Sequence, residues 1–444
     1  MKKRWTVRSA LGATCVLFCA GSVGADEISD VELTELEEMR ALVLELQQQV
    51  GAQAEQMEAQ GDAIHEARER EAKRENLSGL DPFFRSIEIG GWVATSWWYN
   101  FNDPPGHALT NANQGAGGAF YPFHPDSNSF EVDQVWFEME KPVTEDSRAG
   151  FRLDMVYGLT AAQLGGPSAR AGGDSASSFN LYQAYVQYRL PVGDVRLRAG
   201  KFATLLGAEV AQTVYNWNVS RGNVYNLLQP IAHYGVIFDG AVGNFSWSIG
   251  GVNNGDCCGT SPDNNNEKSL LVSGSYGTDT FSVGTSLQWG VAGAADSHPT
   301  GTFDLLASWD PNERFSTWLN FDYKWAPRNS TFAGASPDGW GLAVAGRVGI
   351  TESLGFALRG EVLHDDDQLF GISDAGGAGT ETDIWGITGT LDWTVYENLV
   401  AKAEVRYDSV SIRDGDDHSV FINSNGGFSK SDQVVGGLEL SYMF

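Results

Sequence analysis

The chain has 444 residues, of which 42% are hydrophobic and 19% are charged, and its 57 acidic residues outnumber its 29 lysines and arginines. The resulting formal net charge of -28 argues against nucleic acid as a partner, because proteins that bind nucleic acid need basic patches. Outside the N-terminal leader no run of about 18 apolar residues occurs, so the sequence predicts no membrane-spanning helix.

Residues 1–25 have the pattern of a secretory signal peptide. Four basic residues precede an apolar run over residues 10–20, and the small side chains of Val23 and Ala25 suit cleavage before Asp26. Cleavage places the mature chain outside the cytoplasm. It also changes the formal net charge from -28 to -32, since four basic residues leave with the peptide.

Residues 26–76 are rich in Glu, Gln, Ala and Leu and contain no aromatic residue, which predicts a periplasmic helix. Apolar side chains recur every seven residues along it, at Leu36, Val43, Val50, Met57 and Ile64. This spacing is typical of a coiled-coil seam. We expect a parallel homotrimer through this seam, with a dimer as the alternative. Residues 77–85 are expected to be a linker.

Residues 86–444 contain sixteen segments in which apolar and polar residues alternate, joined in turn by short and long connections. Bacterial barrels have even strand numbers, short periplasmic turns and longer outer loops. The pattern therefore predicts an all-β domain, a 16-stranded antiparallel transmembrane β-barrel. A soluble sheet with one solvated face is the alternative. It is disfavoured because Trp and Tyr recur at both ends of many strands, as in the aromatic girdles of barrels.

The two faces of the predicted strands differ in chemistry, as a period of two requires. Between residues 315 and 325 one face carries Phe315, Thr317, Leu319, Phe321, Tyr323 and Trp325, and the other carries Ser316, Trp318, Asn320, Asp322 and Lys324. A charged side chain facing lipid at mid-depth costs about 2 to 4 kcal/mol, so the polar face must line the lumen.

Strand parity predicts a set of charged residues that line the pore. They are Glu138, Arg152, Asp154, Arg189, Arg196, Arg198, Asp322 and Glu361. The four arginines lie on three consecutive strands and form a basic wall. Opposed to acidic residues elsewhere on the lumen wall, they could set a transverse field that filters ions and orients solutes. The alternative is that these charges pair with one another.

The long connection over residues 203–231 is the candidate constriction loop, because a lumen of this size must be narrowed. It carries few charges and much aromatic surface. Its candidate residues are Glu209, Tyr215, Trp217, Arg221 and Tyr225. Folding into the barrel is one interpretation, and packing over the mouth or against a neighbouring subunit is the other.

The last strand carries Leu438, Leu440, Tyr442 and Phe444 on one parity and ends on an aromatic residue. Tyr442 and Phe444 resemble the signal that the barrel-assembly machinery recognises. Together with the leader, this predicts the outer membrane of a Gram-negative bacterium as the location, with membrane lipid around the barrel and the N-terminal helix in the periplasm.

No catalytic residue, cofactor or metal site is predicted. The histidines lie mostly in loops and lack the spacing of a nucleophile and its base. The acidic runs 365–367 and 414–417 could bind calcium or magnesium, but such runs are usually solvated loop tips. Only Cys257 and Cys258 remain after cleavage of the leader, and adjacent cysteines cannot join distant strands.

Four segments in order resemble the OmpL-like β-barrel porins. They are Gly90–Asn102 (GGWVATSWWYNFN), Phe151–Asp154 (FRLD), Gly200–Glu209 (GKFATLLGAE) and the following residues 223–239. The resemblance implies an outer-membrane channel. We therefore expect a water-filled porin for passive diffusion of small hydrophilic solutes and ions. The alternatives are a channel specific for a sugar or an anionic metabolite, and a non-conducting barrel anchor whose coiled coil tethers the envelope.

Overall fold

The computed structural model describes residues 81–105, 109, 120–164, 178–253, 266–291, 299–326, 336–372, 381–413 and 420–444. Contacts divide the chain into two units, 1–82 and 83–444. The predicted leader and coiled coil, residues 1–76, lie outside the described residues, as do Cys257, Cys258 and the acidic run 414–417. The account that follows therefore concerns the second unit.

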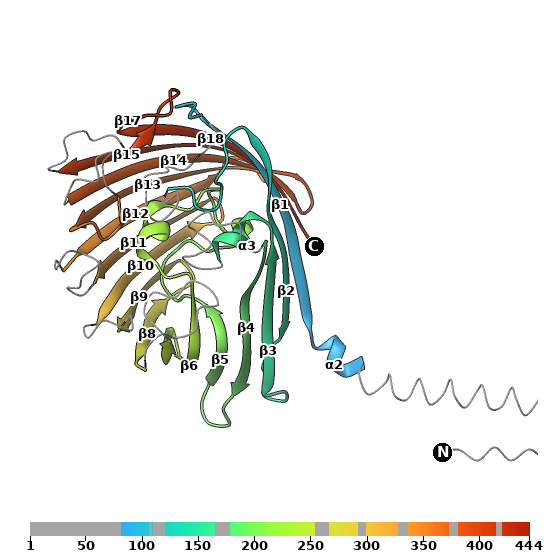
Figure 1. Cartoon of the computed structure of the whole chain (residues 1–444). Helices are drawn as coiled ribbons and strands as arrows, with labels where there is room; N and C mark the ends of the chain where they lie inside the picture. Colours follow the sequence, from blue (N-terminus) through green and yellow to red (C-terminus); the bar gives the residue numbers. More distant parts are fainter. Residues whose placement is uncertain are drawn as a thin grey trace, which may run out of the picture. The chain divides into compact units, whose positions relative to one another are not determined.

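The described strands form a closed barrel of sixteen, which confirms the predicted barrel (Figure 1). They are β1 (Glu88–Asn100), β2 (Ser129–Lys141), β3 (Ala149–Tyr157), β4 (Phe179–Arg189), β5 (Val195–Ala203), β6 (Ala232–Val242), β7 (Phe245–Asn253), β8 (Lys268–Gly277), β9 (Phe281–Gly290), β10 (Thr300–Asn312), β11 (Phe315–Trp325), β12 (Asp338–Gly349), β13 (Leu354–Asp366), β14 (Glu381–Tyr396), β15 (Leu399–Arg413) and β18 (Asp432–Met443). Each pairs antiparallel with its neighbours in sequence, and β1 closes the ring by pairing with both β2 and β18.

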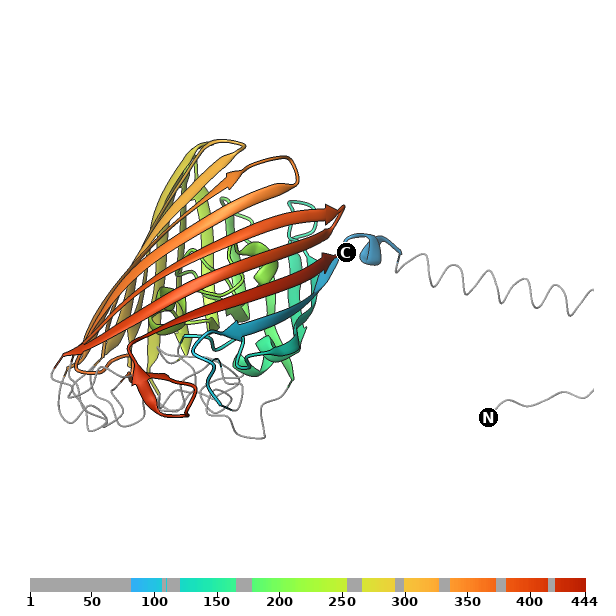
Figure 2. The same cartoon turned by 90° about the horizontal axis from the view of Figure 1, so that it is seen from above.

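Short elements lie before β1 and in the connections between strands. They are α2 (Asp81–Arg85), α3 (Leu159–Gln163), the 3-10 helix η1 (Thr213–Tyr215), α5 (Asn223–Leu228), and the hairpin of β16 (Phe421–Ile422) and β17 (Phe428–Lys430). Among the described residues no helix is both long enough and apolar enough to cross a membrane. In the view from above, the strands run obliquely to the barrel axis (Figure 2).

The predicted alternation of faces is present in the strands. In β15 the side chain of Val405 is 59% exposed on the outside, whereas its neighbour Arg406 is fully buried inside. Lys402, Glu404 and Asp408 share the inner face with Arg406 and are also buried. Because one step along a strand reverses the direction of the side chain, this register keeps every charge of β15 between residues 402 and 408 out of the lipid.

The C-terminus lies at the seam where the barrel closes. The backbone of Phe444 exchanges two hydrogen bonds with that of Gly91 in β1, of 2.9 and 3.1 Å. A side chain at Gly91 would collide with both the Trp136 carbonyl and the Phe444 ring, so only glycine fits there. Phe444 is 60% exposed and Tyr442 is 48% exposed, and Tyr442 pairs with Val93 on the outer face. The proposed assembly signal therefore occupies an accessible outer edge of the seam.

Candidate functional site

The connection between β5 and β6, residues 204–231, lies inside the barrel. This segment, hereafter the inner loop, is the yellow-green chain within the ring of strands in Figure 1. It forms hydrogen bonds with inward-facing side chains of many strands. They include Gln134 of β2, Tyr182 of β4, His233 of β6, Ser286 of β9, Asp304 of β10, Asn320 and Asp322 of β11, Arg359 and Glu361 of β13, Thr390 of β14, Glu404, Arg406 and Asp408 of β15, and Glu439 of β18. The loop therefore spans the lumen and does not lie over the mouth.

Glu404 of β15 fixes the middle of the inner loop. Its two carboxylate oxygens accept the backbone N–H groups of Val219 at 2.6 Å and Ser220 at 3.0 Å. The hydroxyl of Thr390 on β14 also donates to Glu404, at 2.7 Å, and accepts from the Asn218 amide at 2.7 Å. Glu404 is 2% exposed. A buried carboxylate that accepts three hydrogen bonds is well satisfied, so this contact both stabilises the charge and positions the loop.

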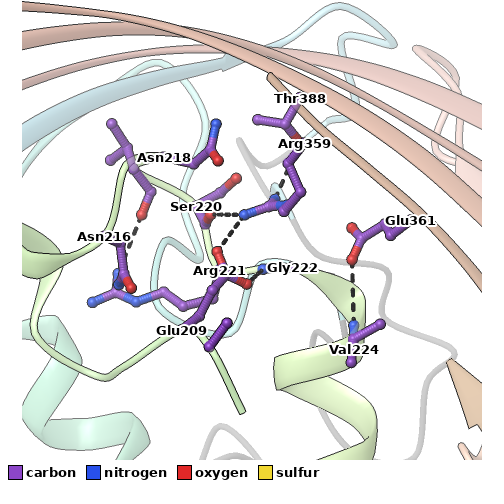
Figure 3. Close-up of polar contacts among 12 residues, drawn as sticks. Glu209, Asn216, Asn218, Ser220, Arg221, Gly222, Val224, Arg359, Glu361 and Thr388 are labelled. Carbon is purple, nitrogen blue, oxygen red and sulfur yellow. Dashed lines mark hydrogen bonds and ion pairs between the residues drawn. The ribbon is translucent and has the colours of Figure 1, made fainter. Parts of the chain in front are cut away.

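A buried ion pair joins the inner loop to β13 (Figure 3). The guanidinium of Arg359 lies 2.5 Å from the Glu209 carboxylate and also donates to the Ser220 carbonyl and to Thr388. The N–H of Gly222 donates to the same glutamate at 2.6 Å. Burial raises the pKa of Glu209, and the adjacent Arg359 opposes that rise. A Cβ at residue 222 would lie 2.6 Å from Glu361 and 2.9 Å from Glu209, so any larger residue would displace these two carboxylates.

Charged residues of β13 and β15 hold α5. The backbone N–H of Asn223 donates to Glu361 at 2.7 Å (the longer contact from Val224 is drawn in Figure 3). Arg406 donates to the Arg221 carbonyl and to the Asn223 side chain, both at 2.7 Å. It also pairs with Asp408, at 2.8 Å. These contacts fix the second half of the inner loop against the wall of late strands.

The five candidate residues of the constriction loop divide into two groups. Glu209, Arg221 and Tyr225 are buried at 8%, 2% and 3% exposure. Arg221 donates to the carbonyls of Ala211 and Val219 and stacks on the ring of Phe123. These three therefore hold the loop together. Tyr215, which is 58% exposed, and the half-buried Trp217 remain on its open face.

A small aromatic cavity of about 190 Å³ lies on that open face. Its walls include Tyr215 and Trp217 of the inner loop and Trp318 of β11. The rings of Trp217 and Trp318 stack with their centroids 6.2 Å apart. Ala208, Glu209, Asn216 and Asn218 complete the lining, so flat apolar surfaces and polar residues meet in one place.

Each arginine of the predicted basic wall has an acidic partner, as the pairing alternative requires. Nitrogen to oxygen distances are 2.8 Å for Arg152–Asp154, 2.9 Å for Arg152–Glu140, 3.0 Å for Arg152–Glu138, 3.3 Å for Arg189–Glu145, 3.2 Å for Arg189–Asp194, 3.4 Å for Arg196–Asp239 and 2.6 Å for Arg198–Asp239. The carboxylates come from the same strand, from neighbouring strands or from the adjoining turns. The wall is consequently a set of local ion pairs and not a bare positive surface.

Three predicted pore-lining acids are covered. Asp154 and Asp322 are fully buried, and Glu361 is 4% exposed. The amide of Gln229 in the inner loop donates to Asp322 at 2.6 Å, while Asp154 is shielded by Arg152 and Gln183. Parity gives the correct inner face for these residues but cannot show that other groups cover them.

Small side chains line the inner wall from β7 to β10. Cross-strand register places Ser248, Ser273 and Ser286 in one row with Asp304, and a second row holds Ser246, Ser275 and Gly284. A cavity of about 560 Å³ opens on this wall, and a second of about 430 Å³, lined mainly by residues of β4–β7, meets it at Ser246. The inner loop thus leaves open space beside small polar residues and, in the smaller cavity, beside the ion-paired Arg196 and Asp239.

Part of the first long connection also lies inside the barrel, which the sequence analysis does not anticipate. Phe120, Tyr121, Phe123 and His124 are each at most 2% exposed. The Tyr121 hydroxyl donates to Asp408 at 3.2 Å, and its ring faces Arg406. The aromatic run at residues 120–124 was a usable signal, because a connection exposed to water would not need so many rings.

Residues 86–444 match the model of the family described as "Putative beta-barrel porin-2, OmpL-like". No curated protein sequence matches the chain. Among solved structures, OprB of Pseudomonas putida at high pH has a TM-score of 0.54 and 12% identity, covering 83% of this chain and 96% of its own. The outer-membrane channel DcaP of Acinetobacter baumannii has a TM-score of 0.53 and 12% identity, and the match covers 81% of this chain and 97% of DcaP. An anion-selective porin from Comamonas acidovorans has a TM-score of 0.52 and 11% identity, and the match covers 81% of this chain and 99% of that porin. At these identities the structures establish a shared fold alone.

Proposed function

Since the chain belongs to the OmpL-like family of β-barrel porins, it is an outer-membrane porin, and we propose that small hydrophilic solutes and ions diffuse through it along the inner wall of β7–β10. The observation that carries this proposal is the asymmetric filling of the lumen. The inner loop is fastened mainly to β11, β13–β15 and β18, while a cavity of about 560 Å³ lies against the serine-rich strands β7–β10 and one of about 430 Å³ lies beside it, against β4–β7. A wide barrel with part of its lumen filled is a narrow water-filled channel.

The charges that remain accessible support weak ion selectivity. The side chain of Arg196 is 39% exposed and that of Arg189 is 27% exposed, but each guanidinium has a carboxylate within 3.4 Å. Paired charges present little net field to a passing ion, whereas rings of one sign filter ions strongly. We therefore propose that size, set by the inner loop, limits passage more than charge.

We further propose a homotrimer whose N-terminal helices associate in the periplasm through the heptad positions Leu36, Val43, Val50, Met57 and Ile64. Without a partner this apolar stripe would be exposed to water, and a parallel coiled coil buries it. The lipid-facing strands and the accessible Phe444 are consistent with assembly in the outer membrane by the barrel-assembly machinery.

Planar-bilayer recording of the purified full-length protein tests these proposals together. We expect stepwise conductance in groups of three and a reversal potential close to zero under a salt gradient, because the arginines that face the lumen are paired with carboxylates. A strong preference for cations or anions would contradict the charge argument, and single steps only would contradict the trimer. A folded barrel with no conductance would favour the alternative of an anchor that tethers the envelope.

A channel specific for a sugar is the second candidate, and the aromatic cavity beside Trp217 favours it. Sugars bind by stacking their apolar faces on aromatic rings while amides reach their hydroxyls. If the cavity binds sugar, a neutral monosaccharide such as glucose will block the current saturably. Trp217→Ala should then abolish the block, whereas Trp309→Ala, which changes an outward-facing tryptophan of β10 that is 51% exposed, should not. If glucose lowers the current only in proportion to the viscosity of the solution, and equally in the unaltered protein and both variants, the specific channel is excluded.

A further inference from the structure

A cluster of three buried ligand-type side chains lies where the first long connection meets β2. His124, Glu131 and Asp133 each place one nitrogen or oxygen within 4.8 Å of the others. They are 1%, 8% and 1% exposed. The cluster is separate from the inner loop, and neither the family match nor the proposed diffusion path accounts for it.

The hydrogen-bonding capacity of this cluster is largely unused. Both ring nitrogens of His124, both carboxylate oxygens of Glu131 and one oxygen of Asp133 are buried without a hydrogen bond of normal geometry. Buried polar atoms are satisfied in most proteins, and an unpaired buried carboxylate is especially costly. Three side chains that together carry five such atoms, and that each place one ligand atom within 4.8 Å of the others, indicate a ligand that accepts their lone pairs.

Electrostatics indicates that this ligand is a cation. Among the described residues neither Glu131 nor Asp133 forms an ion pair with a lysine or arginine, and the nearest cationic candidate is His124 itself, with Nδ1 3.2 Å from Asp133. Two carboxylates taken out of water require compensating positive charge. Imidazole nitrogen combined with carboxylate oxygen is a donor set that suits Zn²⁺, whereas Ca²⁺ and Mg²⁺ prefer oxygen ligands alone.

The surroundings of the cluster also resemble those of a built site. The Ser96 hydroxyl donates to Asp133 at 3.0 Å and accepts from the Trp98 indole at 2.9 Å, which fixes the orientation of the carboxylate. The Trp98 ring lies against His124, with centroids 4.6 Å apart. Partners of this kind orient metal ligands and tune their affinity. The ligand atoms of a tetrahedral zinc ion lie roughly 3.4 Å apart, so the most widely separated pair of the cluster would have to close by up to about 1.4 Å when the ion binds.

We propose that His124, Glu131 and Asp133 bind one divalent metal ion of the Zn²⁺ type, with water completing its coordination. Because His124 belongs to the first long connection and both carboxylates belong to β2, the ion ties that connection to the barrel wall. It also supplies the positive charge that the buried carboxylates lack.

Isothermal titration of Zn²⁺ into the chelator-treated, detergent-solubilised full chain tests the proposal. The protein should carry Cys257→Ser and Cys258→Ser, so that thiolates do not compete. We expect one high-affinity equivalent of zinc per chain, much weaker binding of Ca²⁺ and Mg²⁺, and a higher unfolding temperature with zinc. X-ray absorption at the zinc edge should show nitrogen and oxygen ligands.

Matched variants assign the site. Glu131→Gln and His124→Ala should each raise the Kd for zinc at least about tenfold. His364→Ala removes another histidine that lies beside an aspartate, with His364 Nδ1 2.8 Å from Asp383, at an exposed position, and should leave the Kd unchanged. Heat-modifiable migration on gels verifies that each variant is folded. Absence of a tight equivalent, or an unchanged Kd in a folded Glu131→Gln variant, would overturn the proposal and leave protons as the compensating charge.

Discussion

Replacing Arg406 with methionine is expected to destabilise the barrel by about 3 to 5 kcal/mol, because the substitution leaves buried carboxylates without their counter-charge. The Arg406 guanidinium lies 2.8 Å from Asp408 and 3.8 Å from Glu361, and all three side chains are at most 4% exposed. Methionine fills much of the same volume but supplies no donor. The loss should appear as a lower urea midpoint for unfolding, followed by heat-modifiable migration.

The same strand offers a control for this prediction. Arg413, at the outer end of β15, pairs with Glu381, but its side chain is 63% exposed. Exposed ion pairs contribute about 0 to 1 kcal/mol, so Arg413→Met should hardly move the midpoint. If the two substitutions cost the same, water must reach Arg406 freely, and the close packing of the inner loop against β15 would be wrong.

Removing the core of the inner loop is expected to raise single-channel conductance severalfold. Residues 208–222 would be replaced by a short glycine-serine linker. Sixteen-stranded porin barrels enclose an aqueous lumen, and this segment occupies it from β2 to β15. The wall groups released by the deletion, such as Glu404 and Arg359, would be hydrated by lumen water. The barrel should therefore still fold, which heat-modifiable migration can verify.

A deletion elsewhere controls for shortening the chain. Residues 424–426 form the exposed tip of the β16–β17 hairpin, and their removal should leave conductance as it is. An inner-loop deletion that folds but conducts like the intact protein would contradict the assignment of this loop as the constriction. Ions would then be limited at another level of the pore.

The fold was predictable because its signal is local. Alternation with a period of two separates Val405 from Arg406 within one strand, and the order of short and long connections gives strand number and direction without any tertiary information. The inward position of the inner loop was also accessible, since a connection that carries Tyr215, Trp217 and Tyr225 with few charges is poorly suited to water. Each of these inferences depends on residues close together in the chain.

The details of the site were not predictable for the opposite reason. Val219 and Glu404 are bonded across 185 residues, and Arg359 and Glu209 across 150. Parity places Asp322 on the inner face, but only the folded molecule shows that Gln229 covers it. His124 is one of several loop histidines in the sequence, and nothing near it in the chain indicates that Trp98 packs against its ring.

The bonded residues are far apart in the sequence, and this distance also determines the order in which the parts of the molecule assemble. The inner loop is synthesised before β10–β18, yet most of its partners belong to those strands. A chain that has formed only β1–β9 offers the loop Gln134 and Ser286 but still lacks most of its partners on the barrel wall. Non-local contacts are made late because the intervening chain must first be ordered. The inner loop should accordingly dock only as the final strands add and Phe444 meets Gly91, so that narrowing of the pore and closure of the barrel become a single step.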